Sequence, residues 1–157
     1  MMKLKTNIDA PAKHKRAIKA AADAFMATLS PAVHHPKGWS VNIVLADNAT
    51  VHHLNKTYRG KDKPTNVLSF PTDPADPTLA LQPNHPLGDI IFAHEVLAQE
   101  AEATNIPYHH HLQHLTLHGL LHLLGYDHEI SDAEAELMAS TEVFILKNLD
   151  IPNPYHQ

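Results

Sequence analysis

A run of eleven residues, 118–128, contains three histidines and constrains this chain more than any other part of it. If the run begins as a helix, His118 and His122 project from one face, because four residues make about one helical turn. Gly125 is suited to end that helix, since glycine readily adopts the left-handed conformation found at helix ends. His128 follows the turn, where the returning chain can aim it at the pair. Three neutral imidazoles with an open fourth position are typical of a catalytic zinc, so we expect these histidines to hold one zinc ion per chain.

The same histidine pair has an alternative explanation that involves no metal. The chain contains fifteen histidines, so a pair at this spacing also arises by coincidence. The metal is favoured because the helix is rich in leucine and largely buried, so that its imidazoles need polar partners. Gly119, which costs roughly 1 kcal/mol relative to alanine inside a helix, indicates a close approach to a packing helix or to a substrate. His114 shares the helical stripe but lies ~12 Å from His122 along the axis, too far to be the third ligand.

The histidine run resembles the signature of the YbeY-type endoribonuclease family, a family of bacterial rRNA maturation factors. The pattern of that signature is HGxLHLxGYDH, and residues 118–128 match it at every fixed position. The spacing is also similar to that of the HExxHxxGxxH zinc peptidases, which place a glutamate general base directly after the first histidine. Gly119 occupies that place here, so a peptidase would lack its base. Asp127 can orient a ligand histidine or simply face solvent.

A second stretch, residues 55–71, resembles another signature of the same family. Its sequence, NKTYRGKDKPTNVLSFP, reads as a basic loop followed by a short strand. Arg59 can present its planar guanidinium to a phosphate, although loop charges are usually only solvated. The resemblance implies a functional role for Arg59, which we expect to be catalytic by holding the phosphate and offsetting charge that develops on it. Asn66 stands where many family members have aspartate. Residues 87–90 resemble the family's LGDI segment, in which Asp89 can belong to the site, support it from behind, or simply accept a hydrogen bond at the strand edge. We favour the structural interpretation of Asp89.

Hydrophobic periodicity and turn residues predict an α+β fold. We expect a single domain over residues 1–157 with a short tail at 152–157. It should contain a small mixed sheet of about four strands with helices packed against it, one of them a zincin-like metal helix. The resemblance implies the same fold over residues ~40–148. A segment with four prolines, residues 72–86, is expected to be a long loop. The predicted strands are 2–8, 39–46, 67–70 and 87–92, and the predicted helices are 47–58, 94–104 and those beginning at Asp9, Pro107 and Ser131.

Composition limits the possible metal ligands, the cellular location and the binding partners of such a domain. The chain has no cysteine, so a metal must be bound by His, Asp or Glu. No apolar run approaches the ~20 residues of a membrane span, and the N-terminus lacks the apolar core of a signal peptide, so we expect a cytoplasmic protein without a membrane partner. Eleven of the twelve Lys and Arg lie in residues 1–63, whereas residues 64–157 carry thirteen of the seventeen acids. This asymmetry can mark a basic face for a polyanion, or the charges can intermix in three dimensions.

The resemblance implies a metal-dependent endoribonuclease that acts on single-stranded RNA. It further implies a part in 16S rRNA 3′-end maturation and ribosome quality control, with rRNA and the small ribosomal subunit as partners. Zinc held by His118, His122 and His128 can polarise a phosphoryl oxygen or lower the pKa of bound water towards ~7. The residues identify no general base, and either water or the 2′-hydroxyl of the RNA can be the nucleophile.

Three alternatives stay open at this point. The first is a zinc-dependent hydrolase of peptides or small molecules, which Gly119 disfavours. The second is a non-catalytic ribosome-assembly factor in which the metal is structural. The third is a histidine-rich globular domain with no site.

Overall fold

Strand pairing in the described part of the chain produces one four-stranded sheet in the order β1-β2-β4-β3. The structure is a computed structural model. It describes residues 4–28, 37–63, 65–125 and 131–155. Strands β1 (Leu4–Asp9), β2 (Trp39–Ala46) and β4 (His85–Ala93) are parallel to one another. Strand β3 (Val67–Pro71) pairs antiparallel to β4 at the edge. The predicted small mixed sheet is therefore confirmed.

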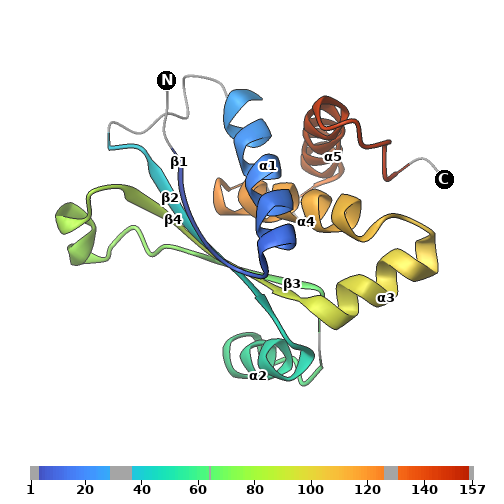
Figure 1. Cartoon of the computed structure of the whole chain (residues 1–157). Coiled ribbons are helices and arrows are strands. Elements are labelled where there is room, and N and C mark those ends of the chain that lie inside the picture. The colour runs from blue at the N-terminus through green and yellow to red at the C-terminus, as the bar shows by residue number, and fades with distance from the viewer. Residues whose placement is uncertain (1–3, 29–36, 64, 126–130, 156–157) are drawn as a thin grey trace.

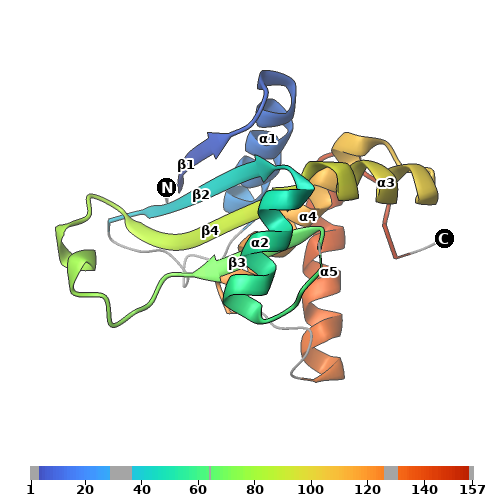
Figure 2. The same ribbon diagram turned by 90° about the horizontal axis from the view of Figure 1, so that it is seen from below.

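Helices cover both faces of this sheet (Figure 1). Helices α1 (Ala12–Thr28), α4 (Tyr108–Leu123) and α5 (Asp132–Asn148) lie on one face. Helix α2 (Asn48–Arg59) lies on the other face, and Figure 2 shows it in front of β3. Helix α3 (His94–Thr104) continues directly from the end of β4 and leads towards α4. The predicted α+β class and the predicted order of elements are confirmed. Within the described residues, no helix is long and apolar enough to cross a bilayer.

Helix α4 lies in the main hydrophobic core. Four of its leucines are fully buried: Leu112, Leu117, Leu120 and Leu121. They belong to one cluster with apolar side chains from α1, α5 and the sheet. Burying a leucine stabilises a fold by about 1.5–3 kcal/mol relative to leaving it exposed. These contacts hold α4, and with it the histidines on its surface, in one position relative to the sheet.

Gly119 explains how closely α4 approaches the sheet. A Cβ atom at this position would lie 2.9 Å from Cδ1 and 3.2 Å from Cγ2 of Ile90 in β4. The glycine therefore allows the helix backbone to rest directly on the strand. The sequence predicted a close approach, but the two suggested partners, a packing helix and a substrate, are wrong because the neighbour is a strand.

The segment with four prolines before β4 contains more structure than the loop that the sequence predicted. It includes a short 3-10 helix, η2 (Pro77–Leu81), preceded by Asp76. The carboxylate of Asp76 accepts a hydrogen bond from the N–H of Thr78 at 2.9 Å, which caps the turn. Strand β4 also begins at His85, two residues before the predicted start. The prediction of a loop missed this short 3-10 helix, and the earlier start of β4 is a difference at an element end, where sequence patterns are weakest.

Candidate functional site

His118 and His122 lie on one side of α4, as their spacing predicted. Their ring centroids are 4.9 Å apart and the ring planes are inclined at 70°. The helix ends at Leu123, and Gly125 follows with a φ of 103°. The N–H of Gly125 donates a hydrogen bond to the carbonyl of His122 at 2.9 Å. The glycine therefore ends the helix just behind the second histidine, which is the geometry that the sequence indicated.

The third predicted ligand, His128, lies outside the described residues, as does Asp127. Among the side chains that the structure does describe, no group of three His, Asp or Glu could hold a metal ion. Two of the three predicted ligands thus lie side by side, and the metal-binding role of all three stays a prediction.

A buried carboxylate lies behind His118. Glu142 of α5 is fully buried, and its Oε1 atom accepts a hydrogen bond from Nδ1 of His118 at 2.6 Å. Its Oε2 atom accepts hydrogen bonds from Nε2 of His114, at 3.0 Å, and from the hydroxyl of Tyr155. A carboxylate has only acceptor atoms, so a neutral His118 carries its proton on Nδ1 and its lone pair on Nε2.

The protonation state of Glu142 follows from its surroundings. Burial raises the pKa of this carboxyl group, but hydrogen bonds from His114, His118 and Tyr155 outweigh burial and lower the pKa to about 2. Glu142 is therefore ionised at neutral pH. Burial, together with the hydrogen bond to Glu142 and its negative charge, raises the pKa of Tyr155, so the tyrosine stays a hydroxyl donor.

Sequence reasoning identified neither Glu142 nor Tyr155 as part of the site. The sequence does carry a signal for Glu142, because it shares a helical stripe with Met138, Ile145 and Leu146, which are buried. A carboxylate within an apolar stripe requires a buried hydrogen-bond partner. Tyr155 gives no comparable signal, since it lies beyond the last helix in the segment that the sequence suggested was a tail.

Arg59 is the last residue of α2. The helix ends there because Gly60 adopts a left-handed conformation with a φ of 68°, and its N–H donates to the carbonyls of Asn55 and Lys56. The exposed guanidinium of Arg59 donates a hydrogen bond to the carbonyl of Ser69 in β3 at 3.4 Å. Helix α4 packs against β3 from the other face of the sheet. Strand β3 is therefore the common neighbour of Arg59 and of the helix that carries the histidine pair.

A buried amide holds the basic loop that follows Arg59. The side chain of Asn55 is 1% exposed and donates a hydrogen bond to the carbonyl of Lys63 at 2.8 Å. The backbone carbonyl of Asn55 accepts from the N–H of Lys61 at 3.2 Å. These two contacts fold the backbone of the loop back onto the last turn of α2.

Two other residues of the family segments have structural partners. The side-chain amide of Asn66 donates to the carboxylate of Glu100 at 3.2 Å. The carboxylate of Asp89 accepts from the amide of Asn42 at 3.0 Å, on a part of the sheet that is exposed. The interpretation of Asp89 as a structural residue agrees with this contact.

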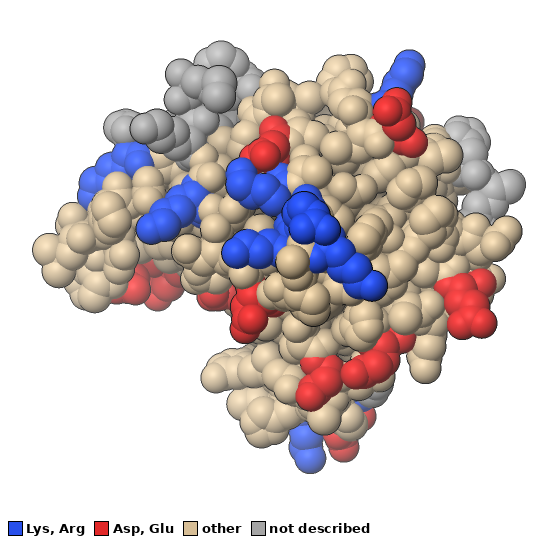
Figure 3. Space-filling model, viewed as in Figure 1, with Lys and Arg blue, Asp and Glu red and all other residues tan. Residues whose placement is uncertain are grey.

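Basic side chains gather on the face of the molecule that carries α1 (Figure 3). Four exposed residues of α1 are basic: Lys13, Lys15, Arg16 and Lys19. Three of them, Lys15, Arg16 and Lys19, line a groove of about 520 Å³ beside β1. Lys19 is also paired with Asp23 at 2.6 Å. Part of the positive charge of residues 1–63 therefore forms a local basic face on α1, whereas Lys56 and Arg59 lie on α2 at the other face of the sheet.

The fold and the site together define a class of protein. It is a small α+β domain in which a helix with a histidine pair packs on a mixed sheet and a buried carboxylate supports one of the histidines. The model of the family described as Endoribonuclease YbeY matches residues 4–150 of this chain. The chain therefore belongs to this family.

Similar proteins from several bacteria carry the name endoribonuclease YbeY. The protein from Bradyrhizobium sp. (strain BTAi1) is 46% identical over 149 residues, which cover 89% of this chain and 79% of the relative. The protein from Magnetococcus marinus is 46% identical over 129 residues, which cover 75% of this chain and 87% of the relative. The solution structure of TM1509 from Thermotoga maritima matches with a TM-score of 0.58 at 21% identity, covering 99% of this chain and 100% of that one. This last likeness shows the fold.

Proposed function

We propose that this protein is an endoribonuclease that cleaves single-stranded RNA with the help of a bound metal ion. The observation that carries the proposal is the match to the endoribonuclease YbeY family over residues 4–150. The similar proteins from Bradyrhizobium and Magnetococcus bear the same name. The histidine pair on α4 supports the metal, because phosphoryl transfer is a reaction that metal ions assist.

The donor atoms of this site fit a zinc ion. His118 and His122 offer imidazole nitrogens from one helix face, and Glu142 leaves Nε2 of His118 as the atom with the lone pair. We assign one zinc ion per chain to His118, His122 and His128. When bound, zinc supplies a Lewis acid for the reaction at the phosphate.

We assign to Arg59 the role of binding the phosphate of the RNA. Its guanidinium is always protonated, and it lies exposed beside the edge strand β3. The planar fork of an arginine can donate two parallel hydrogen bonds to phosphate oxygens. Arg59 would thus orient the RNA and offset the negative charge that develops on the phosphate during cleavage.

The family resemblance of residues 55–71 and 118–128 supports a more specific substrate and process. We assign rRNA as the substrate, with 16S rRNA 3′-end maturation and ribosome quality control as the process. The small ribosomal subunit would be the partner, and the cytoplasm would be the place of action.

The surroundings of Gly119 weigh against the peptidase alternative. A zinc peptidase of the HExxH type needs a glutamate at this position. A side chain there would point at Ile90, whose Cδ1 atom lies 2.9 Å from an ideal Cβ. A glutamate in this place would be driven into the hydrophobic core, so the position cannot supply a general base.

Replacing His118, His122 or His128 by alanine tests the proposed function. We expect zinc per chain to fall from about one to near zero. Cleavage of a single-stranded RNA oligonucleotide should fall by more than about 100-fold, because even changes behind a metal ligand typically cost 10- to 100-fold. Zinc is measured by elemental analysis of protein purified without a histidine tag, since the histidines at the start of α4 can bind added metal loosely.

The exposed His53 of α2 provides a matched control, and His53→Ala should keep both zinc and cleavage. Loss of zinc and cleavage with an intact fold supports the enzyme. Collapse of the fold together with zinc loss would support a structural ion instead. Unchanged zinc and cleavage in all three variants would show that these histidines do not hold the ion and would overturn the assigned site, whereas a wild type with neither zinc nor cleavage would leave a histidine-rich domain without a site.

A further inference from the structure

We propose that Glu142 and Tyr155 are positioning residues for the metal ligand His118, so that the segment after α5 is a working part of the metal site. This inference rests on the proposed function, because it concerns the same zinc ion. It assigns a role to two residues that lie outside both family segments described above.

Glu142 contacts His118 directly. The Nδ1 and Oε1 atoms are 2.6 Å apart, and the side chain of Glu142 is 1% exposed. Water does not compete for this carboxylate, so the hydrogen bond is strong and directional. It sets the rotation of the imidazole ring and keeps the proton on Nδ1, so that Nε2 is the nitrogen that would bind the metal ion.

Three hydrogen-bond donors surround the carboxylate of Glu142. His118 donates to Oε1, whereas His114 and Tyr155 both donate to Oε2. With three donors from two other elements, the carboxylate cannot turn without breaking a buried hydrogen bond. Losing one partner of a buried charged group is costly because the remaining group keeps its burial without its compensation. Tyr155 therefore stabilises the orientation of Glu142, and through it the orientation of His118.

Hydrogen bonds and packing fix the path of the chain after α5. Ile151 is 7% exposed, and its N–H donates to the carbonyl of Leu146 at 3.0 Å, which fixes the turn after the helix. The N–H of Tyr155 donates to the side chain of Asn153 at 2.8 Å. The Tyr155 ring meets the His114 ring edge-on, with centroids 5.5 Å apart and planes at 90°. The segment is thus tied to α5 at one end and to α4 at the other.

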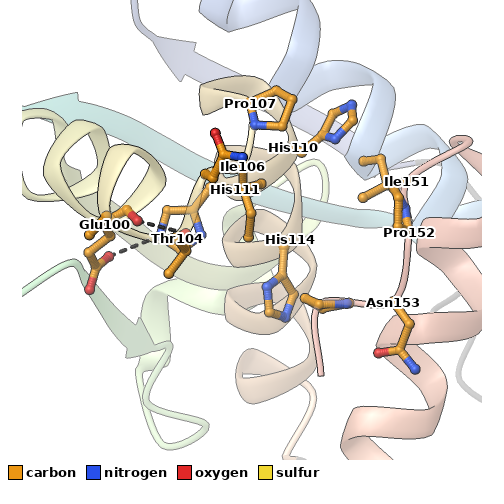
Figure 4. A pocket seen from close by; sticks show the side chains of 13 residues that line it. Glu100, Thr104, Ile106, Pro107, His110, His111, His114, Ile151, Pro152 and Asn153 are labelled. Carbon is orange, nitrogen blue, oxygen red and sulfur yellow. Dashed lines mark hydrogen bonds and ion pairs between the residues drawn. The ribbon is translucent and has the colours of Figure 1, made fainter. Parts of the chain in front are cut away.

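Figure 4 shows the same segment from the side of a neighbouring cavity. Ile151, Pro152 and Asn153 form one wall of a cavity of about 660 Å³, and His114 of α4 lies across from them. The residues before Tyr155 therefore line one side of this cavity, and the segment reaches α4 at Tyr155, whose ring meets that of His114.

A purely structural role is the competing explanation. Glu142 would then only connect α4, α5 and the segment after α5. A buried ionic group is, however, a weak source of stability compared with apolar residues of the same size. The two explanations differ in whether Glu142 affects the affinity for zinc, which can be measured without any RNA.

The test compares Glu142→Gln and Tyr155→Phe with the wild type, using full-length untagged protein. We measure the dissociation constant for zinc by competition with a chromophoric chelator, and the melting temperature of the metal-free protein. Zinc affinity should fall about 10- to 100-fold in Glu142→Gln, as expected for a changed partner of a metal ligand. It should fall about fivefold in Tyr155→Phe, which loses one hydrogen bond to the carboxylate. In nitrogen NMR spectra, the Nδ1–H form of the His118 ring should lose population in Glu142→Gln.

The chain offers a matched control for each variant. Glu100 also accepts a hydrogen bond from a histidine, His111, at 2.9 Å, and the hydroxyl of Tyr108 is bonded to His94 at 2.6 Å. Glu100→Gln and Tyr108→Phe should therefore leave the zinc affinity within about twofold of the wild type, since neither partner histidine is an assigned ligand.

The outcomes separate the inference from the proposed function. Unchanged zinc affinity in Tyr155→Phe and Glu142→Gln, with or without a lower melting temperature, would overturn the inference while zinc binding by the wild type still stands. If Glu142→Gln fails to fold, Tyr155→Phe decides alone. A wild type that binds no zinc through His118 would overturn the proposed function and this inference together.

Discussion

At the scale of single residues, the two faces of strand β3 carry different chemistry. Arg59 reaches the strand from α2 with an exposed guanidinium, whereas α4 packs against the strand from the other face with His118 and His122 on its surface. The arginine offers a permanent positive charge, and the histidines offer lone pairs. These roles are separable, so a change in Arg59 should not alter metal binding.

Replacing Arg59 by alanine is expected to lower kcat for RNA cleavage by about 100-fold, which is typical of removing one preorganised group that stabilises developing charge. Zinc per chain should stay at the wild-type value. Arg59→Lys should recover only part of kcat, because an ammonium group lacks the two-point contact of a guanidinium. The measurements are kcat and KM on a single-stranded oligonucleotide, together with elemental analysis.

Arg16 of α1 is the other arginine of the sequence and provides the control for this experiment. Arg16→Ala should keep kcat, since the residue lies on the face that carries α1, away from β3. Full cleavage activity in Arg59→Ala would show that Arg59 does not hold the phosphate.

At the scale of elements, the contact between α4 and β4 determines how the histidine helix is seated. Gly119 brings the helix backbone onto Ile90, which is fully buried and, as a β-branched residue, has little freedom to move aside. The closeness of this contact means that even one added methyl group disturbs the packing.

Gly119→Ala is therefore expected to destabilise the protein by about 1 kcal/mol. Alanine improves helix propensity by roughly 1 kcal/mol, but overpacking the core typically costs about 1–3 kcal/mol. Ile90→Val removes the Cδ1 atom at 2.9 Å, so the double variant should lose less stability than the sum of the two single variants. Urea unfolding measures all three variants. A Gly119→Ala protein that is more stable than the wild type would show that the contact is looser than the structure indicates.

At the scale of the whole molecule, two clusters of buried apolar residues hold the elements together. One cluster of buried residues joins α1, α4, α5 and the sheet, and a second, smaller cluster fastens α2 to the other face with Val51, Leu68 and Ala93. A domain of 157 residues buries enough apolar surface to fold on its own. The proposed zinc should therefore add stability to a domain that is already folded.

Removing zinc with a chelator is expected to lower the melting temperature by about 5–10 °C without unfolding the protein. An ion present at a hundred times its dissociation constant contributes about 2.7 kcal/mol, and 1 kcal/mol corresponds to about 2–4 °C in a domain of this size. Far-ultraviolet circular dichroism and calorimetry measure both properties. Loss of helical signal on chelation would instead favour the alternative in which the metal is structural.

Local patterns in the sequence determined the kinds of elements, their order and most of their ends. Gly125 ends α4 with a positive φ, as predicted. The helix start predicted at Ser131 is also confirmed, and its hydroxyl caps α5 by accepting from the N–H of Glu134 at 3.1 Å. His118 and His122 share a helix face for the same reason. Each of these features depends on contacts within about one helical turn, so the spacing of residues is sufficient to predict it.

Only the tertiary structure decided what lies behind the histidines and beneath the helix. Glu142 meets His118 across 24 residues of chain, and Tyr155 meets His114 across 41. Gly119 meets Ile90 of a strand instead of the expected helix or substrate. Such pairings depend on which apolar faces pack together when the whole chain folds. The spacing of residues along the sequence does not specify which faces these are. The sequence by itself therefore determined which side chains of α4 could bind a metal, and the fold decided which distant side chains hold one of those ligands in place and which of its nitrogens carries the lone pair.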